Sequence, residues 1–170
     1  MICINNYYIY KHITPDNKIY IGITKHDPES RWKDGKGYIG QWFYKAIDQF
    51  GWNNISHEIL NTGLSELDAY RLETVYIRNI FHSYIPSIGY NDTLGGIYRV
   101  RCHPIRCIEK NVVFPYCSEM AQYLGFNYQS GISECYHKSI DSHGNVTPVL
   151  HKGFHFEAAL SLKEGDVFPK

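Results

Sequence analysis

The sequence lacks the features that mark membrane-spanning and secreted proteins. It has no run of about 18 apolar residues, so we expect no segment that crosses a membrane. The start, Met1 to Tyr10, has no basic stretch followed by an apolar one. We therefore expect no secretory signal and, by default, a cytoplasmic protein. No internal repeat is visible along the chain.

Cysteine is scarce and irregularly spaced. The 5 cysteines are an odd number and include no CxxC pair, so a disulfide framework is not expected. A zinc site built from Cys102, Cys107, Cys117 and either His103 or Cys135 is one interpretation, but these spacings match no tight zinc knuckle. We favour the other interpretation, that the cysteines are reduced and mostly buried thiols.

The chain carries no net charge. Its 17 Lys and Arg residues balance 17 Asp and Glu residues. The overall charge therefore does not attract the phosphates of nucleic acid, as the net charge of a basic chain does. The basic residues are nevertheless concentrated in two stretches, and a local patch can attract DNA where the sum does not. The stretches hold Lys18, Lys25, Arg31, Lys33, Lys36 and Lys45, and then Arg99, Arg101, Arg106 and Lys110.

The N-terminal part of the chain carries the local signals of an α+β domain. Runs of β-branched and aromatic residues flank the turn formers of ITPDN, which predicts a β-hairpin. Asp27 before Pro28, and Ser65 before a long periodic segment, are typical helix N-caps. The expected elements are a hairpin over 7–12 and 18–23, helices over 28–34 and 41–50, a strand over 55–60 and a helix over 66–80.

A second unit is expected after the pair Gly95-Gly96, which divides the chain into domains over 1–98 and 99–170. The patterns predict a hairpin over 105–114, a helix over 119–124 capped by Ser118, a helix over 130–138 and a strand over 153–156. Two short helices followed by a strand pair suit a small α/β helix-turn-helix-like module with a wing. Its candidate DNA contacts are Arg101, Arg106, Ser130, Ser133, His137 and Lys138.

Glu73 is the residue that physical chemistry singles out. Its helical neighbours at three and four residues are Ala69, Tyr70, Tyr76 and Ile77, so a carboxylate lies within an apolar stripe. Burying an unpaired charge is costly, and such a residue usually has a metal, a cation or a hydrogen-bond donor as its partner. The alternative is that Glu73 lies at the edge of the stripe and reaches water or a nearby basic residue.

Several short motifs together resemble the GIY-YIG nuclease family. Their order and spacing match over residues 8–91, about half of the chain. The motifs are YIY at 8–10, KIYIG at 18–22, RW at 31–32, LETVYI at 72–77 and GYN at 89–91.

The resemblance implies a fold, an activity and a set of site residues. The fold is α+β, with a small mixed or antiparallel three-stranded sheet flanked by helices. The activity is hydrolysis of DNA phosphodiester bonds, with Mg²⁺ (or Mn²⁺) held by Glu73. Nearby cations would lower the pKa of Tyr20 so that it can deprotonate the attacking water. The implied catalytic residues are Tyr10, Tyr20, Arg31, Glu73, Asn91 and His26, where His26 is the assisting residue and Lys25 or Lys36 is the alternative to it.

The first half-motif departs from the family because tyrosine stands at position 8, where glycine is usual. Either Tyr8 or Tyr10 then fills the first tyrosine position, and we prefer Tyr10. The segment CSEMAQYLGF over 117–126 is similar to modules attached to homing nucleases. These likenesses imply double-stranded DNA as the partner and a monomer or weak dimer. They also imply a site-specific nuclease in a phage-infected or bacterial cell. The alternatives are a restriction or repair nuclease, or a non-catalytic DNA-binding protein.

Overall fold

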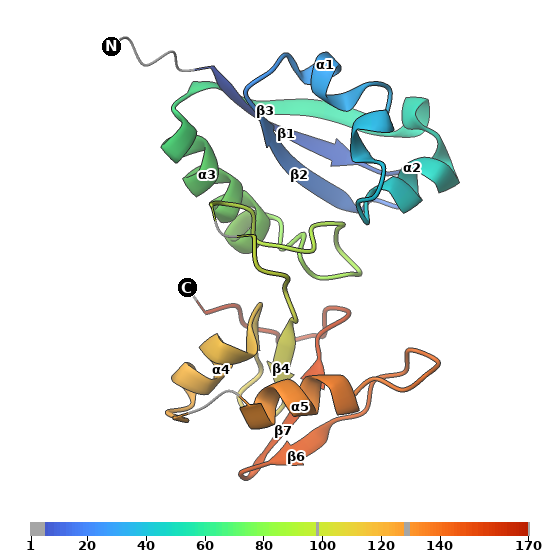
Figure 1. Cartoon of the computed structure of the whole chain (residues 1–170). Coiled ribbons are helices and arrows are strands. Elements are labelled where there is room, and N and C mark those ends of the chain that lie inside the picture. Colours follow the sequence, from blue (N-terminus) through green and yellow to red (C-terminus); the bar gives the residue numbers. More distant parts are fainter. Residues whose placement is uncertain (1–5, 98, 128–129, 170) are drawn as a thin grey trace. The chain divides into compact units, whose positions relative to one another are not determined.

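The computed structural model describes residues 6–97, 99–127 and 130–169, with the Ser130 side chain left out. The chain forms two compact units, Met1–Arg101 and Cys102–Lys170, so the division falls at 101 rather than at 98 (Figure 1). Helices and antiparallel sheets occur in both units, which confirms the α+β class. Within the described part of the chain, no helix is long and apolar enough to cross a membrane.

An antiparallel three-stranded sheet forms the centre of the first unit. Its strands are β1 (Tyr7–Ile13), β2 (Ile19–Thr24) and β3 (Ser56–Leu64), in the order β2-β1-β3. The predicted hairpin is confirmed, and its turn closes through a positive φ of 63° at Asn17. Because β1 is the central strand, β2 keeps one free edge.

Helices surround this sheet. The first segment comprises α1 (Pro28–Trp32), η1 (Lys36–Tyr38), α2 (Tyr44–Phe50) and η2 (Trp52–Asn54). Farther along the chain, α3 (Glu66–Val75) continues into a π-helical turn, η3 (Tyr76–Ile80). Figure 1 shows α3 on the side of the sheet away from α1 and α2. Asp27 and Ser65 accept backbone N–H groups as the predicted N-caps.

Successive side chains of β1 point to opposite faces of the sheet, and this divides the interior of the first unit into two layers. Tyr10 and His12 face the aromatic cluster that includes Trp32, Tyr38 and Phe43. Helix α3 contacts β1 and β2. Aromatic rings therefore fill the layer between the sheet and α1–α2, and five of the 15 tyrosines of the sequence belong to this cluster.

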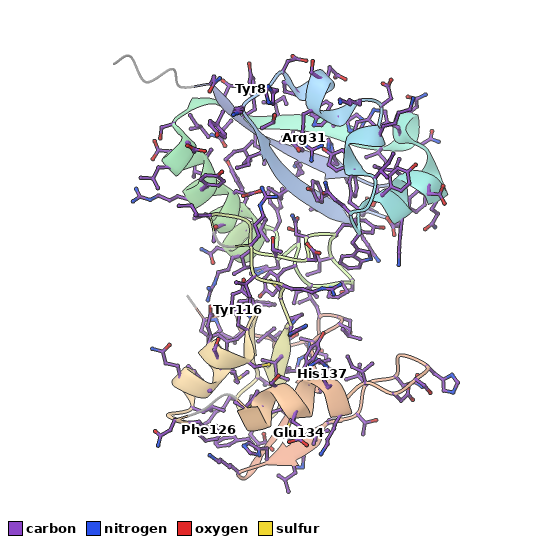
Figure 2. All side chains as sticks on the ribbon, in the orientation of Figure 1. Tyr8, Arg31, Tyr116, Phe126, Glu134 and His137 are labelled. Carbon is purple, nitrogen blue, oxygen red and sulfur yellow. The ribbon has the colours of Figure 1, made fainter. Side chains whose placement is uncertain are left out.

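The second unit is a four-stranded antiparallel sheet with two helices. The sheet order is β5-β4-β7-β6, formed by β4 (Ile105–Cys107), β5 (Val112–Phe114), β6 (Val149–His151) and β7 (Phe154–Ala158). Helices α4 (Cys117–Tyr123) and α5 (Ser130–Lys138) pack on it, and the exposed residues Glu134 and His137 lie on α5 (Figure 2).

Two predictions for the second unit were wrong. The cap of α4 is Tyr116 rather than Ser118, which lies inside the helix. The final strand pair is not a separate wing, because β7 pairs with β4 and joins the first hairpin in one sheet. Cys107, Cys117 and Cys135 lie in the apolar core of this unit, where burial raises the pKa of each thiol.

Candidate active site

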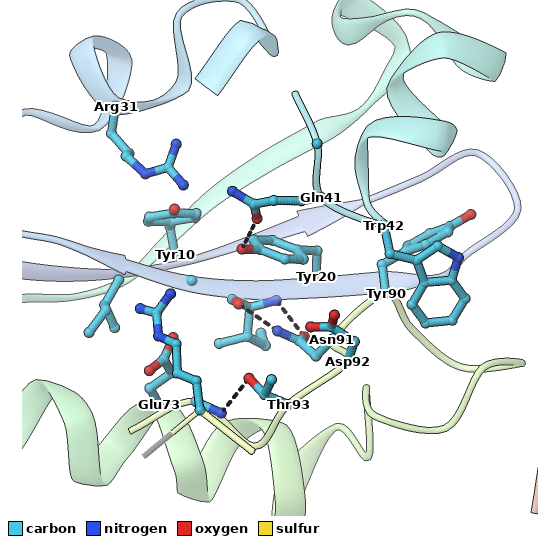
Figure 3. Close-up of a pocket in the computed structure, with 16 residues that line it drawn as sticks. Tyr10, Tyr20, Arg31, Gln41, Trp42, Glu73, Tyr90, Asn91, Asp92 and Thr93 are labelled. Carbon is cyan, nitrogen blue, oxygen red and sulfur yellow. Dashed lines mark hydrogen bonds between the residues drawn. The ribbon is translucent and has the colours of Figure 1, made fainter. Parts of the chain in front are cut away.

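A pocket of about 410 Å³ lies at the free edge of β2 in the first unit (Figure 3). Its walls come from β1, β2, α1, α3 and the segments that follow η1 and the π-helical turn. Five of the six predicted catalytic residues line it, although they are spread from position 10 to position 91. These residues are Tyr10, Tyr20, Arg31, Glu73 and Asn91.

Tyr20 lies on the edge strand with its ring on the aromatic side of the sheet. The ring stacks on Phe43 at 4.6 Å between centroids, and the hydroxyl donates to Oε1 of Gln41 at 3.2 Å. Burial raises the pKa of Tyr20 above its ordinary 10.0, and Arg31 and Arg99 oppose this only in part. The expectation that nearby cations lower this pKa is therefore wrong. The free protein holds Tyr20 as a neutral phenol at physiological pH.

Tyr10 lies against Gly22, its register partner across the β1–β2 pair. A Cβ built on Gly22 would lie 2.6 Å from the Tyr10 hydroxyl, so only glycine leaves room for this ring. Tyr10 is buried and lines the pocket, whereas Tyr8 is absent from the lining residues. The structure thus favours Tyr10 over Tyr8 as the site tyrosine.

Arg31 approaches the pocket from α1. Its Nη1 donates to the carbonyl oxygen of Gly37 at 2.7 Å, and its guanidinium lies 4.8 Å from the centre of the Tyr38 ring. These two contacts fix the plane of the guanidinium. An oriented, permanently charged fork is suited to bind an anionic oxygen in the pocket.

Glu73 enters the pocket from α3 and is only 4% exposed. Its Oε2 accepts the backbone N–H of Gly96 at 2.9 Å. A Cβ on Gly95 would lie 2.5 Å from the same carboxylate, so the Gly95-Gly96 turn can close over Glu73 only without side chains. Burial raises the pKa of Glu73, opposed by the Gly96 hydrogen bond and by Arg99. The carboxylate is therefore poorly neutralised and is poised to accept a cation.

Asn91 closes the free edge of β2. Its Oδ1 accepts the N–H of Ile21 at 3.0 Å, and its Nδ2 donates to the Ile21 carbonyl at 2.8 Å. Ser83 donates to the same Oδ1 at 2.8 Å. The side-chain amide thus takes the place of a neighbouring strand and supports the fold at this edge of the sheet.

The predicted assisting residues do not reach the pocket. Lys25, His26 and Lys36 are exposed, and none of them lines it. Lys25 and Lys36 remain candidates for contacts with DNA outside the pocket.

The predicted DNA contacts on the second half of the chain differ in accessibility. Arg101, His137 and Lys138 are exposed, Ser133 is half-buried, and the Ser130 side chain lies outside the described residues. Lys138 pairs with Glu134 at 2.7 Å on the surface of α5.

Arg106 requires a correction. It is 2% exposed and donates to Asp166, Glu157 and the Ser161 carbonyl, with N···O distances of 2.5–2.7 Å. Its guanidinium is committed to this buried network, so we remove Arg106 from the candidate DNA contacts.

Sequence reasoning missed several residues that line the pocket. Gln41, Asp92 and Arg99 supply its additional polar groups. The motif GYN ends one residue before Asp92, and Arg99 was noted only as part of a basic stretch. No local signal marks Gln41, because its contact with Tyr20 spans 21 residues.

Glu73 is the pocket residue best suited to hold a divalent metal. Among the described residues, no group of three or more His, Cys, Asp or Glu side chains is arranged to hold an ion. Magnesium instead keeps several waters and uses one or two carboxylates. The residues therefore fit a hydrated Mg²⁺ or Mn²⁺ held by Glu73, with Asp92 available as a second carboxylate in the same pocket.

Comparisons with protein-family models, curated proteins and solved structures found no match to this chain.

Proposed function

We propose that the protein is a metal-dependent endonuclease of the GIY-YIG type that hydrolyses phosphodiester bonds in double-stranded DNA. One observation carries this proposal. Tyr10, Tyr20, Arg31 and Glu73 come from four different elements and line one pocket. The motif resemblance names these same four residues without reference to their positions in space. Four residues matched to the motifs by chance would not be expected to line the same pocket.

The pocket groups match the demands of phosphodiester hydrolysis. The reaction needs an oriented water, neutralisation of phosphate charge and assistance to the leaving oxygen. Arg31 would bind a non-bridging phosphate oxygen, using guanidinium N–H groups that Gly37 does not engage. Tyr10 and Tyr20, with hydroxyls on the same side of the sheet, would hold the water in line with the phosphorus.

Glu73 would carry the metal. When bound there, Mg²⁺ or Mn²⁺ would neutralise a phosphate oxygen and the leaving 3′-oxygen. The contribution of the chain is a carboxylate held in place by Gly96 and shielded from bulk water. Arg99 adds positive charge in the same pocket, where a scissile phosphate would be attracted.

The second unit would choose the site. Its helix α5 carries the exposed residues His137 and Lys138, which are its candidate contacts with DNA. We therefore favour a site-specific enzyme of the homing or free-standing phage type. A nuclease domain alone would cut with little sequence preference.

The test is cleavage of DNA by the purified full chain. Supercoiled plasmid and phage DNA are incubated with Mg²⁺, with Mn²⁺ and with EDTA, and the product ends are sequenced. We expect nicked or linear products that require the metal. We also expect Glu73→Gln to lower the rate by at least about 10³-fold while DNA binding persists, because the lost charge acts on the metal.

A matched carboxylate outside the pocket is the control. Asp48 is exposed on α2, and Asp48→Asn should cut at the parent rate. Near-parent cleavage by Glu73→Gln would remove Glu73 as the metal ligand. DNA binding without any cleavage by the parent chain would favour a non-catalytic DNA-binding protein instead.

A further inference from the structure

A chain of buried hydrogen bonds leads away from the pocket through the aromatic layer of the first unit. The hydroxyls of Tyr10 and Tyr38 are neighbours, close enough for each side chain to shift the pKa of the other. The Tyr38 hydroxyl lies 2.7 Å from Nε2 of His12, and Nδ1 of His12 lies 2.9 Å from Nδ1 of His57. The chain therefore runs from a pocket residue to His57, which is only half-buried.

The sheet register creates this arrangement. His12 in β1 is the register partner of His57 in β3, and it is 0% exposed among aromatic rings. Burial, helped by His57 and Arg31, lowers the pKa of His12 to about 2. His12 is thus a neutral imidazole with one N–H and one lone pair, and both of its nitrogens are engaged.

Because a neutral imidazole has one N–H and one lone pair, it fixes which partner donates and which accepts in every hydrogen bond of this series. If His12 carries its proton on Nδ1, it donates to His57, and its Nε2 accepts from Tyr38. The Tyr38 oxygen then accepts from Tyr10, and the Tyr10 oxygen offers only a lone pair to the pocket. If His57 is protonated, every bond reverses, and Tyr10 can donate into the pocket.

The pocket tyrosines need a group that accepts a proton from them. Burial raises the pKa of both Tyr10 and Tyr20, so neither is a ready base for the proton of an attacking water. A tyrosine that passes its own proton onward while accepting another never has to ionise. The terminal acceptor can then be an imidazole, whose ordinary pKa lies near neutrality.

We propose that Tyr38, His12 and His57 relay a proton from Tyr10 to solvent, so that His57 finally accepts the proton of the attacking water. This inference rests on the proposed nuclease function. Tyr38, His12 and His57 are positioning residues that act through Tyr10 rather than by touching the substrate.

The transfers balance in protons and bonds. The water gives a proton to the Tyr10 oxygen while its own oxygen bonds to phosphorus; the bond to the 3′-oxygen breaks with its electron pair on that oxygen, which takes a proton from solvent. Tyr10 passes its proton to Tyr38, Tyr38 passes its proton to Nε2 of His12, and Nδ1 of His12 passes its proton to His57. His57 becomes an imidazolium and then releases a proton to water.

The groups around His57 set the expected pH dependence. Burial lowers the pKa of His57, while a hydrogen bond to the Trp52 backbone and the charge of Glu29 in α1 raise it in part. From β1, the facing group is His12, which stays neutral. The relay requires neutral His57, so the cleavage rate should rise with pH through a pKa below 6.5 and stay level above it.

The first test compares pH–rate profiles of the full chain in Mg²⁺ under saturating plasmid. We expect His57→Gln and Tyr38→Phe each to lower kcat on the order of 10²-fold and to abolish the acidic limb. Circular dichroism and DNA binding establish that each variant is folded. His143→Gln, which changes an exposed turn of the second unit, is the control and should keep the parent profile. Parent rates and an unchanged acidic limb in both relay variants would overturn the proposal.

The second test needs no activity. ¹⁵N NMR of the histidine rings in the parent chain reports which nitrogen carries the proton. We expect His12 to be protonated at Nδ1 above pH 7 and to switch to Nε2 as His57 becomes charged. A fixed Nε2–H form of His12 at neutral pH would overturn the relay. If the parent chain cuts no DNA but this switch occurs, the nuclease proposal fails and the directional chain stands.

Discussion

The ring of Tyr10 lies over the backbone of Gly22, with the Tyr10 hydroxyl 2.6 Å from where a Cβ on Gly22 would be. This contact fixes Tyr10 at the pocket wall and explains why the YIG motif ends in glycine. We expect Gly22→Ala to displace the ring and to lower the free energy of unfolding by about 1–3 kcal/mol, as overpacking does. Urea denaturation measures the stability, and plasmid nicking measures the accompanying loss of rate.

A double-mutant cycle tests the cause of that loss. In a Tyr10→Ala background the ring is gone, so Gly22→Ala should cost much less stability than it does in the parent chain. Equal costs in the two backgrounds would show that the Tyr10 ring is not what excludes a side chain at position 22.

Arg31→Lys should cut on the order of 10²-fold more slowly although the positive charge is kept. Lysine cannot reproduce the planar contact with Tyr38 and the bond to the Gly37 carbonyl together. Single-turnover cleavage measures the effect. Lys33→Ala, an exposed change beside it, serves as the control. Parent activity in the Arg31→Lys enzyme would mean that Arg31 acts only as a diffuse charge.

Local elements of the first unit were readable from the sequence. The hairpin, the caps Asp27 and Ser65 and the long helix depend on neighbouring residues, and the structure has them. The same holds for α5, which begins and ends where the sequence pattern predicts.

Contacts between distant segments were not readable. The bond between His12 and Tyr38 spans 26 residues, and the clamp of Asn91 on Ile21 spans 70. Arg106 looked like a surface cation because its partners, Glu157 and Asp166, come from the far end of the chain. The spacing of hydrophobic residues and the positions of turn residues carry no information about contacts between residues so far apart in the sequence.

Asn91→Ala should destabilise the first unit by about 1–3 kcal/mol for each Ile21 group left without a partner. The N–H and carbonyl of Ile21 would both lose their hydrogen bonds at a buried edge. Thermal unfolding of the full chain, followed by near-ultraviolet circular dichroism, measures this. Asn79→Ala, at an exposed position, should change stability by less than about 0.5 kcal/mol. If both variants melt alike, Asn91 does not support the strand.

Arg106→Ala should destabilise the second unit by about 3–5 kcal/mol, because it removes the paired guanidinium from the buried carboxylate of Asp166 and leaves Glu157 with Lys163 alone. Chemical denaturation should show early unfolding of this unit, while metal-dependent nicking by the first unit persists. Cleavage that disappears without any change in stability would instead give Arg106 a role in binding DNA.

The same network predicts acid sensitivity. Burial alone would raise the pKa of Asp166, but the hydrogen bonds and charges of Arg106 and Lys163 together outweigh it and leave this pKa below its ordinary 3.8. The resulting stability is present above pH 3.8 and is lost as pH falls through the lower, folded-state pKa. Denaturation curves between about pH 2 and pH 5 should show this loss in the parent chain and not in Asp166→Asn. Parallel pH dependences in the two chains would contradict the assignment.

Removing the second unit should separate cutting from site choice. A chain ending at Arg101 keeps all pocket residues, including Arg99, whereas a chain ending at residue 98 lacks Arg99. We expect the 1–101 chain to fold, because its sheet and helices lie within this unit, and to nick DNA with weak affinity and little site preference. The 1–98 chain should cut more slowly, because one cation of the pocket is missing.

Binding of a cognate duplex over a salt series compares the full chain with both shorter ones. Fewer phosphate contacts should give a shallower salt dependence. Equal affinity and equal site preference in the full and 1–101 chains would mean that the second unit contributes nothing to DNA recognition.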